Sequence, residues 1–309
     1  MRRLGPRLGL GAAAVLLAAG GFGQTLQQQV AAMAAAYPGH VALYAKNLTS
    51  GATVAVDAER AVATASVIKM TLMLEAFEQV HAGKLSLTQP LELTAANQVP
   101  GSGILQILTP GLRLSLRDTI ALMMTLSDNT ATNMVIDAVG LAPTNAMIAQ
   151  MGLKNTYFYK KVFKPATGSM PEDQKQFGLG KTTAAEMAAV LESIYRCDLG
   201  ERALCSEMIR IMRSQQYRAM LPRYLSTADA SDGLPPIADK IGSLDDVRND
   251  VALVYTRRGP VIISIFTYGN PDQSWTPENQ AEILIGKLAQ AIVQTWSPEG
   301  LAKTVGGDQ

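Results

Sequence analysis

The chain has 309 residues, of which 48% are apolar and 17% are charged, and its 27 basic residues nearly balance 26 acidic ones. The apolar share can fill the core of one large domain or of two entwined ones, which excludes a disordered chain. No basic patch is present, so we expect no nucleic acid and no anionic lipid surface as a partner.

The N-terminus reads as an export leader. Three arginines, Arg2, Arg3 and Arg7, precede an apolar run over 8–22 that is rich in Ala, Gly and Leu. This pattern is typical of a signal peptide, and its apolar part is too short to span a bilayer comfortably. We therefore expect residues 1–23 to be removed, which leaves a mature net charge of −2. The protein would then be periplasmic or secreted, without a stable membrane span; an uncleaved membrane anchor is the alternative.

The remaining chain alternates between helix and strand patterns. An Ala- and Gln-rich helix is expected over 26–37, and helical periods broken by Gly and Pro fill 66–211. A last helix is expected over 277–296, with Thr276 as its N-cap and Pro277 at its first position. Strands are predicted at residues 41–48, 52–56, 251–255 and 261–268.

Strands at both ends with helices between them predict an α+β fold. One sheet would be built from both termini, over 24–60 and 212–309. A helical domain over 61–211 would be inserted into it.

Two cysteines, Cys197 and Cys205, flank a short polar loop between helix-like segments. In an exported protein they could pair and pin two helices together, but the sequence leaves the bond open. They are too few for a zinc site, and His40 and His81 do not join them in a ligand spacing, so we predict no metal and no cofactor.

The string Ser66-Val67-Ile68-Lys69 has a direct chemical interpretation. A serine hydroxyl needs a neighbouring base to become a nucleophile, and a lysine can be that base if its ammonium form is destabilised. Residues three apart share one face of a helix. The apolar pattern over 66–81 predicts such a helix, opened by Ser66, where free N–H groups favour developing negative charge.

Two further strings follow in order, Ser127-Asp128-Asn129 and Lys240-Ile241-Gly242. With the first string, they resemble the S-x-x-K, S-D-N and K-T-G signature of class A β-lactamases and penicillin-binding proteins. The resemblance extends from about residue 25 to 297. It implies that family's fold, an antiparallel sheet flanked by helices with an inserted all-helical domain, and an active site in the cleft between these two parts. It also implies a serine hydrolase that forms an acyl-enzyme.

The resemblance also implies a role for each matched residue. Ser66 is the expected nucleophile, and Lys69 accepts its proton or holds it in position. Ser127 is expected to pass a proton to the leaving nitrogen, with Lys240 as the cation that supports it. Asn129 is expected to contact the substrate's side-chain amide, whereas Asp128 braces the loop. The backbone N–H groups of Ser66 and Ser243 are the expected oxyanion hole.

The third string departs from the family pattern. Its middle position normally carries a hydroxyl that helps to bind the substrate's carboxylate, but here it is Ile241. Ser243 and Arg248 are the candidates to replace that contact; otherwise Arg248 is a surface charge and anionic ligands bind poorly.

A second departure concerns the Ω-loop. Class A β-lactamases carry there a glutamate, in an E-x-x-L-N string, that activates the water for deacylation. The chain instead reads YKKVFKP over 159–165, and between residues 141 and 181 the only acids are Glu172 and Asp173. We give Glu172 as an uncertain deacylation base and expect slow turnover.

Three functions are consistent with these features. The first is a class A β-lactamase-like enzyme, acting as a monomer on small-molecule β-lactams or D-Ala-D-Ala-like peptides. The second is a penicillin-binding D,D-peptidase or a related amidase or esterase. The third is a non-catalytic cell-wall binding module, against which the intact Ser66–Lys69 and Ser127–Asn129 strings argue.

Overall fold

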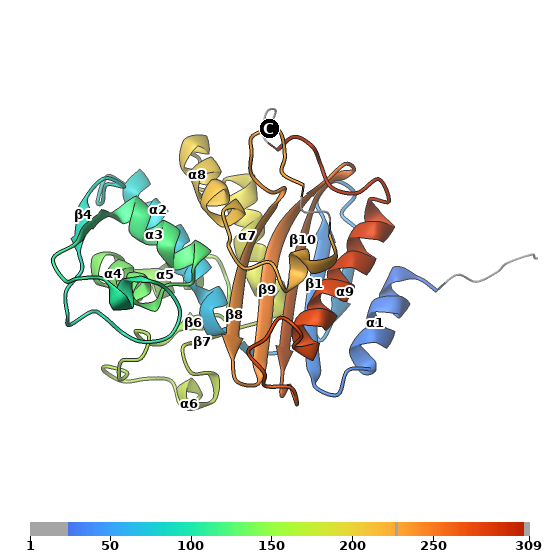
Figure 1. Cartoon of the computed structure of the whole chain (residues 1–309), viewed down its shortest axis with the longest axis horizontal. Helices are drawn as coiled ribbons and strands as arrows, with labels where there is room; N and C mark the ends of the chain where they lie inside the picture. The colour runs from blue at the N-terminus through green and yellow to red at the C-terminus, as the bar shows by residue number, and fades with distance from the viewer. Residues whose placement is uncertain (1–23, 226–227, 306–309) are drawn as a thin grey trace, which may run out of the picture.

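The protein is built around one five-stranded antiparallel sheet with strand order β2-β1-β10-β9-β8. A computed structural model describes residues 24–225 and 228–305. The α+β fold and the origin of the sheet in both ends of the chain are confirmed (Figure 1). The strands are β1 (His40–Asn47), β2 (Thr53–Val56), β8 (Ile237–Leu244), β9 (Val247–Thr256) and β10 (Gly259–Tyr268).

Helices cover both faces of this sheet. On one face lie α1 (Leu26–Ala35) and α9 (Gln280–Trp296), and on the other α7 (Ala184–Arg196) and α8 (Arg202–Arg213) (Figure 1). The interior strand β9 is therefore buried on both sides, which explains why its sequence is almost continuously apolar between Val251 and Tyr255. Each face has its own apolar core.

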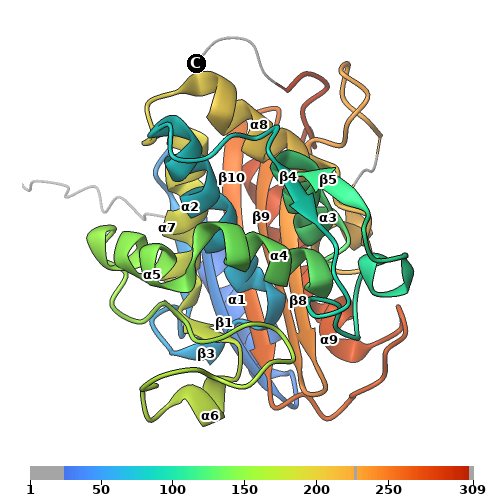
Figure 2. The same ribbon diagram turned by 90° about the vertical axis from the view of Figure 1, so that its left-hand side faces the viewer.

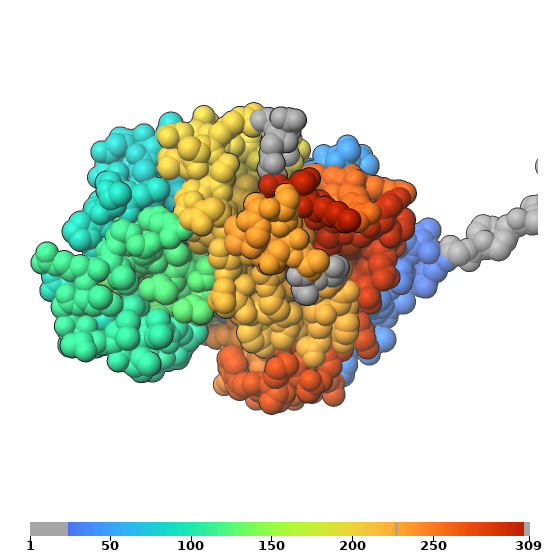
Figure 3. All heavy atoms as spheres, turned by 45° about the horizontal axis from the view of Figure 1, so that its top comes forward, coloured from blue at the N-terminus to red at the C-terminus, as the bar shows by residue number. Residues whose placement is uncertain are grey.

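The inserted segment forms a second part beside the edge strand β8. Figure 2 shows the helices of the inserted segment in front of the sheet. In the space-filling view, the inserted segment forms a cyan and green lobe next to the sheet, and α8, in yellow, lies between the lobe and the sheet (Figure 3). The predicted boundary between the helical domain and the sheet domain at residue 211 stays a prediction. The helices α7 and α8, which precede or cross this boundary, pack on the sheet. The helices of the lobe are α2 (Lys69–His81), α3 (Leu116–Thr125), α4 (Asn129–Val139), α5 (Leu141–Gln150) and α6 (Gln174–Phe177).

Short strands and turns complete this part of the fold. They are the strands β3 (Val62–Ala63), β4 (Pro90–Glu92), β5 (Arg113–Ser115), β6 (Tyr157–Phe158) and β7 (Gly180–Thr182), and the 3₁₀ turns η1 (Ala65–Ile68), η2 (Leu105–Ile107) and η3 (Leu221–Tyr224).

The outer edge of the sheet is closed by a side chain. Gln27 of α1 donates its amide to the Ala55 carbonyl of β2 at 2.8 Å and accepts the Ala55 N–H at 3.1 Å. The amide of Gln27 thus pairs with the β2 backbone as a neighbouring strand residue would.

One predicted helix start is wrong. Helix α9 begins at Gln280 with Asn279 as its N-cap, not at Pro277 with Thr276 as the cap. The Asn279 side chain accepts the N–H groups of Ala281 and Glu282 at 3.0 and 3.3 Å, while Asn279 N–H closes a turn onto Thr276. An asparagine that satisfies two free N–H groups caps the helix better than the preceding threonine does.

The two cysteines form a disulfide between the end of α7 and the body of α8, a pairing that the sequence had left open. The expected signal peptide lies outside the described residues. Within them, no helix is both long and apolar enough to cross a membrane.

Candidate active site

Ser66 lies on the 3₁₀ turn η1, which leads directly into α2. The predicted helix thus starts at Lys69, one turn later than expected. The preceding residue, Ala65, has a left-handed φ of 44°, a conformation that costs a residue with a side chain about 1–3 kcal/mol. Ser66 is half-buried and lines a pocket of about 350 Å³.

Strand β8 presses against this turn. A Cβ atom on Gly242 would lie 2.7 Å from the Thr64 carbonyl oxygen and 2.9 Å from the Ser66 nitrogen. Only a glycine allows that approach, which brings the strand carrying Lys240 and Ser243 against the turn carrying Ser66.

Lys69 is fully buried and contacts the second string. Its Nζ lies 2.8 Å from the Ser127 carbonyl oxygen, 3.2 Å from Ser127 Oγ and 3.0 Å from Asn129 Oδ1. Burial, and after it the charge of Lys240, lowers the pKa of Lys69 well below its ordinary value. A lowered pKa favours the neutral amine, which is the form of lysine that can accept a proton as a general base.

Ser127 joins the two lysines. Lys240 Nζ lies 3.0 Å from Ser127 Oγ and donates to the Ile241 carbonyl at 2.8 Å. Burial lowers the pKa of Lys240 to about 7, against the opposing effect of Asp239 and Asp250. Ser127 itself has a left-handed φ of 53°, so the backbone is held in an uncommon conformation where the two lysines converge.

The next two residues of this string are held by protein groups. Asp128 caps α4 through Ala131 N–H at 2.8 Å and accepts the N–H groups of Ile104 and Leu105 at 2.7 and 2.8 Å. Asn129 accepts from Lys69 and donates to the Pro100 carbonyl at 3.1 Å. Asn129 does not line the pocket, so its contact with a substrate stays a prediction.

The third string contributes Ile241, Gly242 and Ser243 to the pocket wall, but Arg248 lies behind the wall. Its guanidinium is 0% exposed and donates to the carbonyls of Leu244, Val247 (2.9 Å) and Ser274 (2.7 Å). Arg248 is therefore not the surface charge that the sequence left open, and it is not among the residues that line the pocket.

Eight pocket residues were missed by the sequence analysis. Three of them, Ser102, Thr125 and Leu126, lie near the second string or in the loop that faces it. The other five come from the segment after α8, the loop before α9 and the first turn of α9, and are Gln215, Gln216, Tyr217, Trp275 and Glu282. No motif marks these last segments, so only the tertiary packing brings them to the pocket.

Comparison with family models matches residues 25–296 to the beta-lactamase enzyme family. The chain belongs to this family. The resemblance drawn from the three strings is thereby confirmed. Similar solved structures are class A β-lactamases and PBP-A, and together with the family they support a class A β-lactamase-like serine hydrolase.

Among these structures, the beta-lactamase from Sphaerobacter thermophilus DSM 20745 is 30% identical with a TM-score of 0.75, over 87% of this chain and 96% of that one. PBP-A is 25% identical with a TM-score of 0.73, over 87% and 95% of the two chains. A PBP-A mutant, solved as an acyl-enzyme complex with penicillin G, has the same fold at 24% identity and a TM-score of 0.73, over 87% and 95%. A comparison with curated protein sequences found no match.

In this β-lactamase family member, the Ω-loop acids do not reach the pocket. Glu172 is exposed and is not part of the pocket lining. Asp173 accepts from Tyr159 Oη at 2.6 Å and from Lys181 Nζ at 2.5 Å, and the Lys181 hydrogen bond holds its pKa below the ordinary value. The role of Glu172 as a deacylation base therefore gains no support from its position.

The Ω-loop is fixed to α4 by Asn133, which exchanges hydrogen bonds with the backbone of Val162 at 3.0 and 2.9 Å. Across residues 24–225 and 228–305, no group of three His, Cys, Asp or Glu side chains is arranged to hold a metal ion.

Proposed function

We propose that the protein is an exported serine hydrolase that β-lactams acylate at Ser66 and that releases the acyl group slowly. The observation that carries the proposal is the contact of Ser127 Oγ with both lysines, at 3.2 Å from Lys69 and 3.0 Å from Lys240, beside the pocket that Ser66 lines. These groups can move protons between the serine and the leaving nitrogen.

In the proposed acylation, each proton that one group releases is taken up by another. Lys69 accepts the Ser66 proton as Oγ bonds to the lactam carbonyl carbon, and the N–H groups of Ser66 and Ser243 stabilise the oxyanion. The C–N bond breaks as Ser127 protonates the nitrogen, and the proton on Lys69 returns to Ser127. A protonated Lys240 lowers the cost of the transient charge on Ser127.

Slow deacylation follows from the acids near the pocket. Of the described residues that line it, Glu282 is the only acid, and its carboxylate accepts from Tyr217 Oη at 2.8 Å and lies 3.3 Å from Arg248 Nε. A carboxylate held in this way is poorly placed to activate water.

Intact-protein mass spectrometry after mixing with a penicillin tests this proposal. We expect one adduct per chain, on Ser66, that persists for minutes or longer; S66A should form none, whereas S102A, which alters another pocket serine, should retain it. A chromogenic cephalosporin should give a burst equal to the enzyme concentration. Rapid linear turnover that is lost in E172Q would refute slow deacylation.

A D,D-peptidase, or a related amidase or esterase, is the second candidate, favoured by the 25% identity with PBP-A and by the lack of a free acid at the pocket. An assay of D-Ala release, added to the mass spectrometry, separates the two functions. A long-lived penicillin adduct without release of D-Ala from a D-Ala-D-Ala peptide indicates the slow β-lactamase-like enzyme, and a long-lived adduct together with that release indicates a peptidase.

A further inference from the structure

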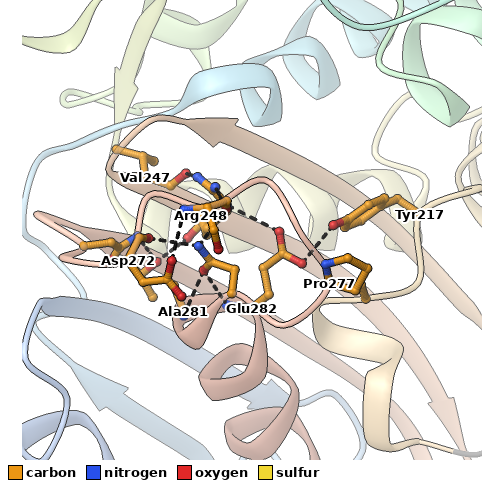
Figure 4. A network of polar contacts seen from close by, with 12 residues as sticks. Tyr217, Val247, Arg248, Asp272, Pro277, Ala281 and Glu282 are labelled. Carbon is orange, nitrogen blue, oxygen red and sulfur yellow. Dashed lines mark hydrogen bonds and ion pairs between the residues drawn. The ribbon is translucent and has the colours of Figure 1, made fainter.

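The pocket wall contains a buried acid that the reaction described above does not use. Glu282, in the first turn of α9, is 3% exposed and lines the same pocket as Ser66 and Ser243. Figure 4 shows its carboxylate between Tyr217 and Arg248, and both contacts are internal to the protein.

Arg248 is held by the protein on the far side of Glu282. Besides its ion pair with Glu282, it donates to the backbone carbonyls of Leu244, Asp245, Val247 and Ser274, and its guanidinium carbon lies 4.6 Å from the centre of the Trp275 ring. A carboxylate that enters the pocket would therefore meet the carboxylate of Glu282 and the indole of Trp275 before it could reach this cation.

Behind the pocket wall the charge of Glu282 is paired with Arg248 at 3.3 Å, whereas within the pocket Ile241 and Gln215 add no positive charge. Ile241 offers no hydrogen-bond donor, and the Gln215 amide is held by Met124 and by the N–H groups of Gln216 and Tyr217. The amines of Lys69 and Lys240 are 0% exposed and face Ser127. Like charges in a partly desolvated pocket repel each other strongly, whereas an uncharged group does not incur this repulsion.

We propose that Glu282 is a specificity-determining residue that disfavours acyl donors with a free carboxylate and selects donors with an uncharged ester or amide in its place. The inference rests on the proposed function, since it names the substrate class of the Ser66 pocket. It is opposite to the sequence expectation that Arg248 and Ser243 bind a substrate's carboxylate.

The first test compares the acylation rate constants of Ser66 with a penicillin and with its methyl ester, by intact-protein mass spectrometry. We expect wild-type protein to react with the ester at least as fast as with the acid. E282Q, which keeps an acceptor for Tyr217, should react about tenfold or more faster with the acid and within about twofold of wild type with the ester.

The matched control is E278Q, which changes the same charge on an 83% exposed side chain outside the pocket. It should leave the ratio of the two rates unchanged. A wild-type preference for the acid, or a shift in the ratio of less than threefold in folded E282Q, overturns the proposal. If E282Q does not fold, the ratio of the wild-type acylation rates with the ester and with the acid decides the proposal by itself.

A second test does not depend on acylation by β-lactams. Two boronic acids that differ only in a carboxylate or a carboxamide bind a nucleophilic serine reversibly, and calorimetry measures their affinities for the wild-type protein. If neither penicillin labels Ser66, the proposed function fails, but tighter binding of the carboxamide still supports the role of Glu282. Tighter binding of the carboxylate, or binding of neither compound, overturns that role.

Discussion

Two residues next to the proposed chemistry have left-handed backbone conformations. Ala65 precedes the nucleophile, and Ser127 lies between the lysines, with φ values of 44° and 53°. Such conformations persist only where the surroundings impose them. Here the surroundings are the close approach of Gly242 to the Ser66 turn and the two lysines on Ser127.

The state of Lys240 should be visible in the pH dependence of acylation. Burial lowers its pKa to about 7, so Lys240 loses its proton as pH rises through 7 and can no longer support the charge on Ser127. The acylation rate of Ser66 should fall by about tenfold per pH unit above this value. Stopped-flow measurements with a chromogenic cephalosporin between pH 5 and 9 would show this.

K240R is the matching variant, because an arginine stays protonated across this range. It should lose the alkaline decline, whatever its absolute rate. A wild-type rate that stays level from pH 7 to 9 would contradict the role given to Lys240.

The sequence strings could predict which residues meet at Ser127 because their chemistry lies in short motifs. They could not predict that Asn129 is held by Lys69 and Pro100, or that Arg248 faces Glu282. The contacts of Asn129 join residues 29 and 60 positions apart along the chain, and the contact of Arg248 joins a strand to a distant helix. Both depend on side-chain packing that no local sequence pattern encodes.

At the scale of elements, α9 and the turn η3 pack unusually closely through Gly286. A Cβ atom on this residue would lie 3.0 Å from the Met220 carbonyl oxygen, from Arg223 Cβ and from Tyr224 Cδ2. The same helix carries Glu282 one turn earlier, so this contact also sets the depth at which Glu282 enters the pocket wall.

We expect G286A to lower the free energy of unfolding by about 1–3 kcal/mol, because overpacking outweighs the better helix propensity of alanine. Urea unfolding followed by circular dichroism would measure it. K287A, at the next and exposed position of the helix, should change stability by less than about 0.5 kcal/mol. Equal stability of G286A and wild type would show that η3 yields to the added methyl group.

Helices and strands with strong periodicity could be predicted from the sequence, as β1, β10 and α1 show. Their ends were less predictable, because caps depend on side chains that reach across a turn. Both Thr276 and Asn279 suit an N-cap, and the choice is set by Asp272, which accepts Gln280 N–H at 2.9 Å and so favours the later start.

At the scale of the whole molecule, two carboxyl groups are buried within the sheet behind the pocket. Asp250 pairs in register with Ile241, and Asp239 lies two residues earlier on β8. Burial raises the pKa of Asp250 to about 7 and raises that of Asp239 well above its ordinary value. Neither oxygen of Asp239 has a hydrogen-bond partner within the described part of the chain.

These raised pKa values should reduce stability as pH rises from about 4 to 7. An unfolded chain releases the Asp250 proton near pH 4, the ordinary pKa of an aspartate, whereas the folded protein keeps this proton up to about pH 7. The contribution of Asp250 to the free energy of unfolding is therefore fully present below pH 4 and is lost as the pH rises through 7. The unfolding free energy of wild type, relative to D250N, should fall by a few kcal/mol, roughly, over this range.

The variant D250N keeps an acceptor for Leu221 N–H, which Asp250 now binds at 3.0 Å. Denaturant unfolding at pH 4, 5.5 and 7.5 supplies the comparison, with D245N as a control on an exposed hairpin residue. If the difference in unfolding free energy between wild type and D250N does not vary with pH, Asp250 has the same pKa in the folded and unfolded chains, which would contradict the prediction.

The closed edge at β2 has a consequence for how the molecule behaves among copies of itself. An uncovered sheet edge is a template on which another chain can add a strand. By occupying both backbone groups of Ala55, the amide of Gln27 removes the most accessible such position at this end of the sheet. A single glutamine on the first described helix thus takes Ala55 out of the backbone positions on which a second copy of the chain could add a strand.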